Sequence, residues 1–318
     1  MDTNVLLTCG RFHGALGLAR DLSASGARVD IADSYALSPA LHSKAVDRSH
    51  IIASPAGDPV GFAKDVARIA RERDIELIVP TFEGGFYLAN YADLIPATLF
   101  APPFEIIRRL HDKARFVEYC HALGIRTPDT LVVDSQDALR DAVAKFENFV
   151  ARPAYSRGGL TYLTNHGPRA GENTVEDCQP TSENPWLVQD YIEGDDACTL
   201  SVARHGEVVL HCAYEPSIAA PGGFSVQFTS IADAAVLDIV SAICRDLNYT
   251  GFIGFDYRRT SDGLVMIECN PRTGPGVFLM PQGWVSEAVI GSPTGLMEVE
   301  PGISRQYDAF MLNRHLVN

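Results

Sequence analysis

Strand-like and helix-like segments alternate over the first hundred residues of the chain. Five short apolar runs are predicted strands, at residues 5–8, 28–32, 51–52, 77–80 and 98–101. Segments 14–25 and 59–73 carry apolar residues at helical spacing and are predicted helices. This alternation favours an open, Rossmann-like parallel sheet, in which ligands approach the carboxyl ends of the strands. We therefore expect the loops at 9–14 and 81–85 to face a ligand.

Glycines follow the first predicted strand, but they do not form the dinucleotide fingerprint. Gly10, Gly14 and Gly17 are spaced more widely than the pattern G-x-G-x-x-G requires. The simpler interpretation is that these glycines permit a tight turn from strand to helix. A nicotinamide-dependent oxidoreductase is therefore retained only as a minor hypothesis.

The pair Pro102-Pro103 marks a predicted domain boundary. Beyond it, Asp112 is a predicted N-cap of an amphipathic helix, and helices and strands follow in an α+β order. From residue 186 onward the sequence predicts mostly antiparallel strands, with one helix over 236–247. The expected domains are 1–103 (α/β), 104–185 (α+β) and 186–318 (α+β).

A hairpin near the end of the chain combines two acids with an amide. Its predicted strands are 254–258 and 264–268, joined by the turn Ser261-Asp262-Gly263. Asp256 and Glu268 then lie on neighbouring strands, and Asn270 shares a face with Glu268. Two carboxylates and one amide oxygen form an oxygen-only site for a hard cation such as Mg²⁺. The alternative is an exposed hairpin with ordinary surface acids.

Three segments before this hairpin carry groups suited to phosphate. Arg157-Gly158-Gly159 lies between two predicted strands, and its glycines would let backbone N–H groups approach phosphate oxygens. Lys113 follows the predicted N-cap, and Arg152 interrupts an apolar run just before Pro153. The alternatives are an ordinary hairpin turn for Arg157-Gly158-Gly159 and solvated surface cations for Lys113 and Arg152.

The segment 186–196 is an apolar strand that runs through Gln189 into Gly194 and a pair of acids. Such a segment can hydrogen-bond a base through its backbone and a ribose through a carboxylate. By itself it is also a plain strand followed by an acidic turn.

In this order, the segments resemble the ATP-grasp superfamily of carboxylate–amine ligases over essentially the full length. The resemblance implies a pre-ATP-grasp domain followed by a two-lobed ATP-grasp fold, with its small lobe at 104–185 and its large lobe at 186–318. Lys113 is similar to the first phosphate-binding lysine of the family, and Val150-Ala151-Arg152-Pro153 resembles the strand V-x-K-P that carries the second. The implied nucleotide-binding residues are Lys113, Arg152, Gly158, Gly159, Gln189, Asp190, Tyr191, Ile192 and Asp196. The implied metal ligands are Asp256, Glu268 and Asn270.

The resemblance also implies a reaction. ATP phosphorylates a substrate carboxylate, and an amine displaces phosphate from the acylphosphate to give an amide. The cofactors would be ATP and Mg²⁺, with Mn²⁺ as an alternative. Arg272 and Arg157 would be catalytic, and the substrates would contact Arg272, Glu83 and Glu215. Small carboxylates and amines, including amino acids, are the expected partners, and a homodimer is left open.

Two residues depart from the family pattern. Arg152 replaces the second lysine, and a planar guanidinium is not equivalent to an ammonium point charge. Asp196 stands where glutamate is commoner, which would shorten the ribose contact. The first departure motivates a second hypothesis, a catalytically silent ATP-binding homologue with a regulatory or structural role.

Composition excludes several other classes of function. The chain of 318 residues carries a net charge of −14 without a basic cluster, so nucleic-acid binding is not expected. It has no apolar run of membrane length and no signal-like N-terminus. Its seven cysteines form no Cys-x-x-Cys pair, which is typical of buried thiols in a cytoplasmic protein.

Overall fold

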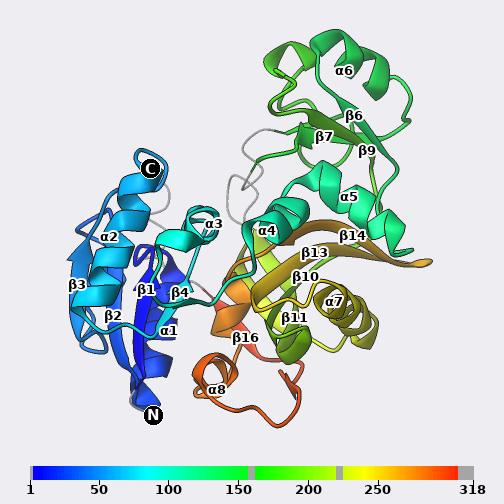
Figure 1. Ribbon diagram of the computed structural model, residues 1–318. Helices are drawn as coiled ribbons and strands as arrows, with labels where there is room; N and C mark the ends of the chain where they lie inside the picture. The colour runs from blue at the N-terminus through cyan, green and yellow to red at the C-terminus, as the bar shows by residue number, and fades with distance from the viewer. Residues whose placement is uncertain (1–2, 157–161, 220–224, 307–318) are drawn as a thin grey trace.

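The computed structural model describes residues 3–156, 162–219 and 225–306 (Figure 1). Three β-sheets organise these residues, and helices cover their faces. Within this part of the chain, no helix combines the length and apolarity needed to cross a membrane.

The first sheet holds five parallel strands in the order β3-β2-β1-β4-β5. They are β1 (Asn4–Thr8), β2 (Arg28–Asp33), β3 (Arg48–Ile51), β4 (Leu77–Pro80) and β5 (Thr98–Leu99). The connecting elements are α1 (His13–Ala24), η1 (Pro39–His42), α2 (Pro59–Glu72), α3 (Gly84–Asn90) and η2 (Ala92–Leu94). The predicted Rossmann-like sheet is confirmed, although its third strand precedes the predicted position 51–52.

Helices cover both faces of this sheet because its central strands are apolar on both sides. On β1, Leu7 packs in the cluster that contains α1, whereas Leu6 packs in the cluster that contains α2. The strand order changes direction between β1 and β4, so the loops after these two strands meet at one edge. Thr81 Oγ1 donates to the carbonyl of Thr8 at 2.5 Å and holds the two loops together.

The second sheet is antiparallel, with the order β6-β9-β7-β8. Its elements are α4 (Phe104–His111), α5 (Lys113–Ala122), β6 (Thr130–Val133), α6 (Gln136–Val143), β7 (Phe149–Pro153), β8 (Leu163–Thr164), η3 (Val175–Asp177) and β9 (Trp186–Asp190). Helix α6 covers one face through Leu139 and Ala142. Because β9 pairs with both β6 and β7, we propose that the small lobe ends after Asp190 rather than at residue 185.

The third sheet has seven strands, with β14-β13-β10-β11-β12-β16 in sequence and β15 beside β11. Its elements are β10 (Asp195–Arg204), β11 (Glu207–Ala219), β12 (Ser225–Ile231), α7 (Ala234–Asp246), β13 (Gly251–Thr260), β14 (Gly263–Asn270), η4 (Pro275–Phe278), α8 (Trp284–Ile290), β15 (Met297–Glu298) and β16 (Ser304–Gln306). Helices α7 and α5 pack on one face, and η4 and α8 pack on the other. The sheet is antiparallel apart from the pair β11–β15.

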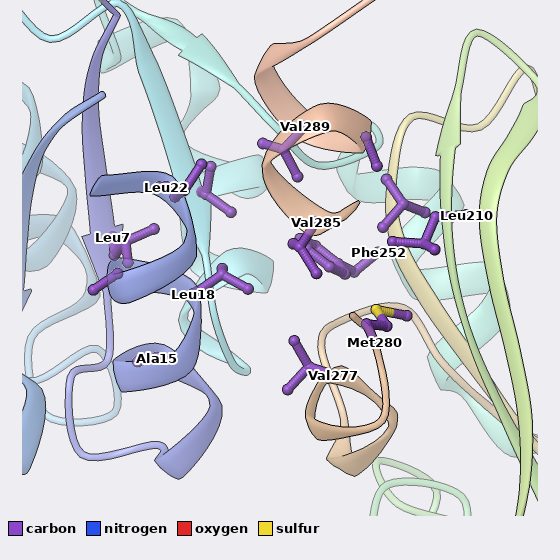
Figure 2. Close-up of a cluster of buried hydrophobic side chains, with 14 of the residues drawn as sticks. Leu7, Ala15, Leu18, Leu22, Leu210, Phe252, Val277, Met280, Val285 and Val289 are labelled. Atoms are coloured by element: carbon purple, nitrogen blue, oxygen red, sulfur yellow. The ribbon is translucent and has the colours of Figure 1, made fainter. Parts of the chain in front are cut away.

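One apolar cluster joins the first sheet to the third (Figure 2). Leu18 and Leu22 of α1 face Val285 and Val289 of α8, and Val277 of η4 lies beside them. The two sheets are therefore held together by buried side chains rather than by strand pairing. This packing brings the loops after β1 and β4 against the loop that follows β14, where Thr273 Oγ1 donates to the carbonyl of Thr81.

Two glycines near this cluster are expected to respond oppositely to alanine. A Cβ at Gly276 would lie 2.7 Å from Leu200 Cβ and 2.8 Å from the Tyr214 ring, whereas none of the described atoms lies within 4 Å of a Cβ at Gly17 in α1. Gly276→Ala should lower the free energy of unfolding by about 1–3 kcal/mol through overpacking. Gly17→Ala should raise it by about 0.5–1 kcal/mol through higher helix propensity. Urea unfolding followed by circular dichroism measures both free energies. An unchanged free energy of unfolding for Gly276→Ala would contradict tight packing around η4.

Candidate functional site

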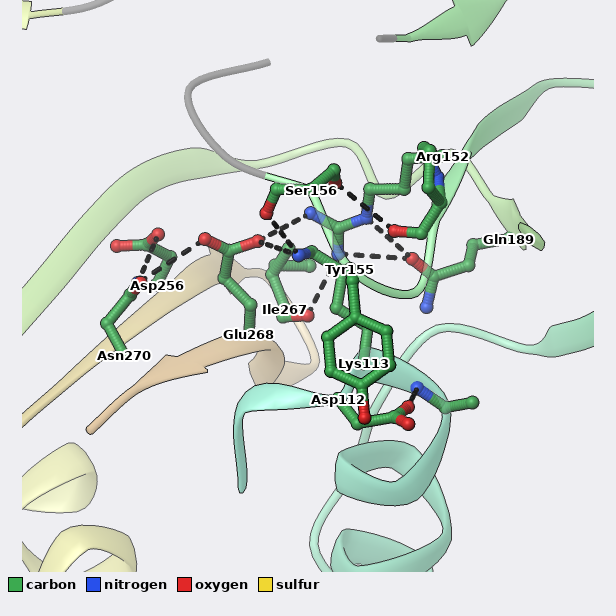
Figure 3. Close-up of polar contacts among 12 residues, drawn as sticks. Asp112, Lys113, Arg152, Tyr155, Ser156, Gln189, Asp256, Ile267, Glu268 and Asn270 are labelled. Atoms are coloured by element: carbon green, nitrogen blue, oxygen red, sulfur yellow. Dashed lines mark hydrogen bonds and ion pairs between the residues drawn. The ribbon is translucent and has the colours of Figure 1, made fainter. Parts of the chain in front are cut away.

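The predicted acidic hairpin forms, with a bulge that shifts the register between Asp256 and Tyr257 (Figure 3). Thr260 pairs with Gly263 across the turn, and Asp256 lies directly opposite Glu268. Asn270 Nδ2 lies 3.4 Å from Asp256 Oδ2 and 3.3 Å from Glu268 Oε1. The three predicted metal ligands therefore meet on one face of the sheet.

The donor set of this trio suits a hard cation that also binds other oxygens. No group of three or more His, Cys, Asp or Glu that could hold a metal occurs in the described part of the chain. The trio offers two carboxylates and one amide, so a Mg²⁺ ion here would complete its shell with water or phosphate oxygens. In the present orientation the Asn270 amide nitrogen faces the acids, and its Oδ1 accepts from Arg272 Nη2 at 3.1 Å. Asn270 would have to turn its amide to offer the oxygen.

Two cations from the small lobe converge on Glu268 (Figure 3). Arg152 Nη1 donates to Glu268 Oε2 at 2.9 Å, and Arg152 Nη2 donates to the carbonyl of Ile267 at 3.0 Å. Lys113 Nζ lies 3.6 Å from the same Glu268 oxygen and donates to the carbonyl of Ser156 at 3.0 Å. The cations predicted to hold phosphate thus lie beside the predicted metal ligands.

Local structure explains where Lys113 lies. Asp112 Oδ1 accepts from the backbone N–H groups of Ala114 and Arg115 at 3.0 and 3.2 Å, which confirms the predicted N-cap of α5. The backbone N–H of Lys113 donates to the carbonyl of Ala154 at 3.3 Å, just after β7. The helix therefore begins against the strand that carries Arg152, and the Lys113 side chain is buried.

The two acids titrate differently because their surroundings differ. Burial raises the pKa of the Glu268 carboxyl, but Lys113 and Arg152 outweigh burial and lower that pKa to about 2. Burial and the charge of Glu268 raise the pKa of Asp256 to about 7. Burial lowers the pKa of the Lys113 ammonium. A divalent cation between the acids would favour the fully ionised pair.

The predicted nucleotide hinge extends from the end of β9 into β10. Gln189 is buried, and its Oε1 accepts from Arg152 Nε at 3.3 Å while its Nε2 donates to Thr130 Oγ1 at 3.0 Å. Asp190 is exposed, and Ile192 is half-buried. The Gln189 side chain therefore positions Arg152, and we propose the backbone beyond it as the base-binding edge.

Tyr191 and Asp196 lie beside an arginine that the sequence analysis did not select. Arg258 Nε lies 3.0 Å from Asp196 Oδ1, and the guanidinium lies 5.9 Å from the centre of the Tyr191 ring. The Tyr191 ring also makes an edge contact with His166, with the ring centres 4.6 Å apart. Arg258 could have been found from the hairpin, because it lies two residues after Asp256 on the same face. His166 had no such signal.

Tyr162 is a further residue of this region that the sequence did not indicate. Burial raises the pKa of its hydroxyl, while the nearby Arg152, Arg169 and Arg258 lower it. The guanidinium of Arg169 lies 4.6 Å from the centre of the Tyr162 ring. Tyr162 therefore lies within electrostatic range of both Arg152 and Arg258.

The predicted substrate residues separate in the structure. Arg272 lies at the metal end, with its guanidinium 4.6 Å from the centre of the Phe82 ring and its Nη1 donating to the carbonyl of Thr273 at 2.9 Å. Glu83 follows Phe82 at the start of α3. The structure does not bring Glu215 to this cluster, because Glu215 pairs with Arg259 at 2.9 Å on the opposite face of the third sheet. Arg157, Gly158 and Gly159 lie outside the described residues.

The placement of Glu215 follows from strand register. Tyr214, Cys198 and Asp256 are opposite one another on β11, β10 and β13, so they share a face. Because successive residues alternate, Glu215 projects to the other face. The prediction of Glu215 as a substrate residue is therefore not supported, because the register turns its neighbour Tyr214 toward the acids instead.

Comparison with known proteins identifies the family of the chain. A sequence model described as an ATP-grasp domain matches residues 110–275, just over half of the chain. The chain belongs to the ATP-grasp family. The match contains the N-cap of α5, both small-lobe cations, the hinge and the acidic hairpin. In this ATP-grasp protein, the ordered set of segments was therefore a better guide to the family than any single motif.

Solved structures share the ATP-grasp fold over nearly the whole chain. N5-carboxyaminoimidazole ribonucleotide synthetase, solved with ADP, is 15% identical with a TM-score of 0.70, covering 94% of this chain and 79% of that chain. An L-amino acid ligase from Bacillus licheniformis is 15% identical with a TM-score of 0.68, covering 94% and 78%. The biotin carboxylase domain of the Hydrogenobacter thermophilus 2-oxoglutarate carboxylase, solved with MgADP and bicarbonate, is 16% identical with a TM-score of 0.71, covering 95% and 73%. These likenesses confirm the predicted fold class.

Proposed function

We propose that this ATP-grasp protein is an ATP-dependent ligase that joins a carboxylate to an amine through an acylphosphate. The observation that carries the proposal is the convergence of Lys113 and Arg152 on Glu268, directly opposite Asp256. Cations and acids in one place suit a nucleotide phosphate bound together with a divalent cation. Support also comes from the similar structures, whose titles describe a synthetase, a ligase and a carboxylase domain.

In this proposal the nucleotide lies between the lobes. Lys113 and Arg152 exchange part of their contact with Glu268 for phosphate oxygens, and the backbone at Tyr191 and Ile192 hydrogen-bonds the base. Asp196 accepts from the ribose hydroxyls in competition with Arg258. Asp256, Glu268 and Asn270 would hold Mg²⁺ or Mn²⁺, which when bound neutralises charge on the transferred phosphoryl group.

In this proposal the chemistry proceeds in two steps. A carboxylate oxygen attacks the γ-phosphorus, and the bond from that phosphorus to the bridging oxygen of ADP breaks. The amine nitrogen then attacks the acyl carbon, the bond to phosphate breaks, and the nitrogen loses a proton. Arg272 would hold the carboxylate by two hydrogen bonds, because its guanidinium lies next to the metal ligands. The lobes exclude water that would hydrolyse the acylphosphate.

The test uses the purified protein with ATP, Mg²⁺ and pooled amino acids. Phosphate release that needs both a carboxylate and an amine supports the ligase. Release that is independent of both, or absent with every pool, contradicts it.

A second candidate function is ATP binding without ligation. The observation behind it is that the Arg152 guanidinium already donates hydrogen bonds to Glu268, Ile267 and Gln189. It therefore bridges the two lobes without a nucleotide. Tight ATP binding without turnover in any substrate pool would favour this function.

The structure weakens the dinucleotide hypothesis. Asp33 ends β2, the position at which a dinucleotide-binding fold uses an acid for the ribose. Here Asp33 accepts from the backbone N–H of Arg11 at 2.6 Å, from Arg11 Nε at 2.9 Å and from Ser38 Oγ at 2.7 Å. The Asp33 carboxylate is therefore already occupied by hydrogen bonds from Arg11 and Ser38.

A further inference from the structure

Four aromatic side chains lie on segments near Arg272, and we call them the aromatic rim: Phe82, Phe86, His111 and Tyr155. Phe82 lies under the Arg272 guanidinium at 4.6 Å. Phe86 of α3 and His111 at the end of α4 have ring centres 4.5 Å apart, and His111 and Tyr155 have centres 6.3 Å apart. Helices α3 and α4 lie side by side at this junction between the first sheet and the rest of the molecule (Figure 1).

The rim remains partly accessible, in contrast to the core aromatic residues. Tyr155 is 42% exposed, and Phe82, Phe86 and His111 are half-buried. Phe82 also stacks on Phe12 at 5.1 Å, which fixes its ring beneath the guanidinium. The faces left for a ligand are therefore those of Phe86, His111 and Tyr155.

His111 adds no charge to the rim at neutral pH. Burial, followed by the nearby Lys113 and Arg272, lowers the pKa of its imidazole to about 4. Lys113 is already directed to Glu268. An anionic group placed against the rim would meet the electron-rich faces of the rings, and a cationic group would meet the charges of Lys113 and Arg272, which act on His111. An apolar group would gain burial.

The space behind Arg272 cannot hold the body of a substrate. A cavity of about 10 Å³ lies there, lined by Phe82, Phe252, Pro271 and Arg272 among others. This volume accommodates about one water molecule. Arg272 Nε is buried and makes no hydrogen bond within the described part of the chain, so a water molecule in this cavity could accept from it. A carboxylate on Arg272 must then extend its remaining atoms toward the rim.

We propose that the carboxylate substrate carries an uncharged apolar group, aromatic in the best case, that packs on the rim while Arg272 holds the carboxylate. This inference rests on the proposed ligase function and names its substrate class. Phe86 is the specificity-determining residue, because its ring comes from the first domain and contacts His111 within the rim.

The test traps the acylphosphate with hydroxylamine, which removes the need to know the natural amine. With ATP and Mg²⁺, hydroxamate formation is compared for 3-phenylpropionate, propionate and succinate, and for phenylalanine, alanine and aspartate. We expect kcat/KM for the phenyl compounds to exceed that for the small and the acidic compounds by about tenfold or more. Phe86→Ala should erase this preference, and Phe86→Leu, which preserves apolar volume, should retain part of it.

Tyr35→Ala is the matched control. Tyr35 is 45% exposed and lies under Arg11 at 5.8 Å, so it is also an accessible aromatic residue of the first domain, but it lies outside the rim. This variant should keep the wild-type preference. A preference for succinate or aspartate, or equal rates for all acids, would overturn the inference while the ligase function stands.

Binding measured without turnover separates the two proposals. Saturation-transfer NMR with 3-phenylpropionate, in the presence of Mg²⁺ and a non-hydrolysable ATP analogue, should show transfer to the phenyl ring that Phe86→Ala abolishes. Such transfer without any hydroxamate would support the apolar subsite and refute the ligase. The absence of both signals would refute both.

Discussion

Replacing Glu268 with alanine is expected to reduce phosphate release by more than about 10³-fold. Glu268 is the carboxylate that Lys113 and Arg152 share, and it lies opposite Asp256. Its removal takes away a metal ligand and leaves two cations without their common partner. Substrate-dependent phosphate release, measured at saturating ATP and Mg²⁺, tests the expectation. Near-normal release would refute the metal assignment.

Two further variants make this result specific. Glu268→Gln preserves the size of the side chain and removes its charge, so it should lose activity nearly as fully as alanine. Glu147→Ala removes an exposed acid before β7 and should leave activity unchanged. Circular dichroism should show a native fold in all three proteins, because β13 and β14 are held by backbone pairing.

Arg152→Met is expected to weaken MgADP binding by about 10–100-fold, whereas Arg152→Lys should stay within about tenfold of the wild type. Methionine removes the charge that lies beside the predicted phosphate position. Lysine restores that charge, but a single ammonium cannot replace the fork that reaches Gln189, Glu268 and Ile267 together. Isothermal titration calorimetry measures the affinities.

Arg140→Met is the control for this pair of variants. Arg140 lies on α6 in the same lobe and also makes an ion pair at 2.8 Å, with Asp137, but it is remote from the hairpin. Its loss should leave MgADP affinity unchanged. If Arg152→Met also binds MgADP normally, Arg152 serves as a contact between the lobes and has no part in holding phosphate.

The parts of the site that could be predicted are those determined by local spacing. An Asp-Gly turn between apolar runs was sufficient to place Asp256 and Glu268 on neighbouring strands. The register of that turn alone would put Asp256 opposite Ile267, and a bulge between Asp256 and Tyr257 puts it opposite Glu268 instead. Asp112 was identified as an N-cap because capping depends on the next three residues, and this placed Lys113 at the start of α5.

Other parts depended on pairing between distant strands. Gln189 became a positioning residue for Arg152 because β9 lies between β6 and β7, more than thirty residues from β7 along the chain. Glu215 was lost from the site because β11 pairs with β10 in a register that turns Tyr214, rather than Glu215, toward the metal ligands. A shift of one residue in register reverses the faces, and spacing within one strand does not determine it.

The sequence alone therefore determined the order of the parts: a parallel sheet, two small-lobe cations, a hinge and an acidic hairpin. Tertiary structure decided how these parts meet. Burial of α1 against α8 and η4 brought the first sheet to the loop after β14 and placed Phe82 under Arg272. Local patterns follow from propensity and periodicity, which act over a few residues. Contacts between distant segments follow from which apolar faces can be buried together, and only the folded chain specifies that choice.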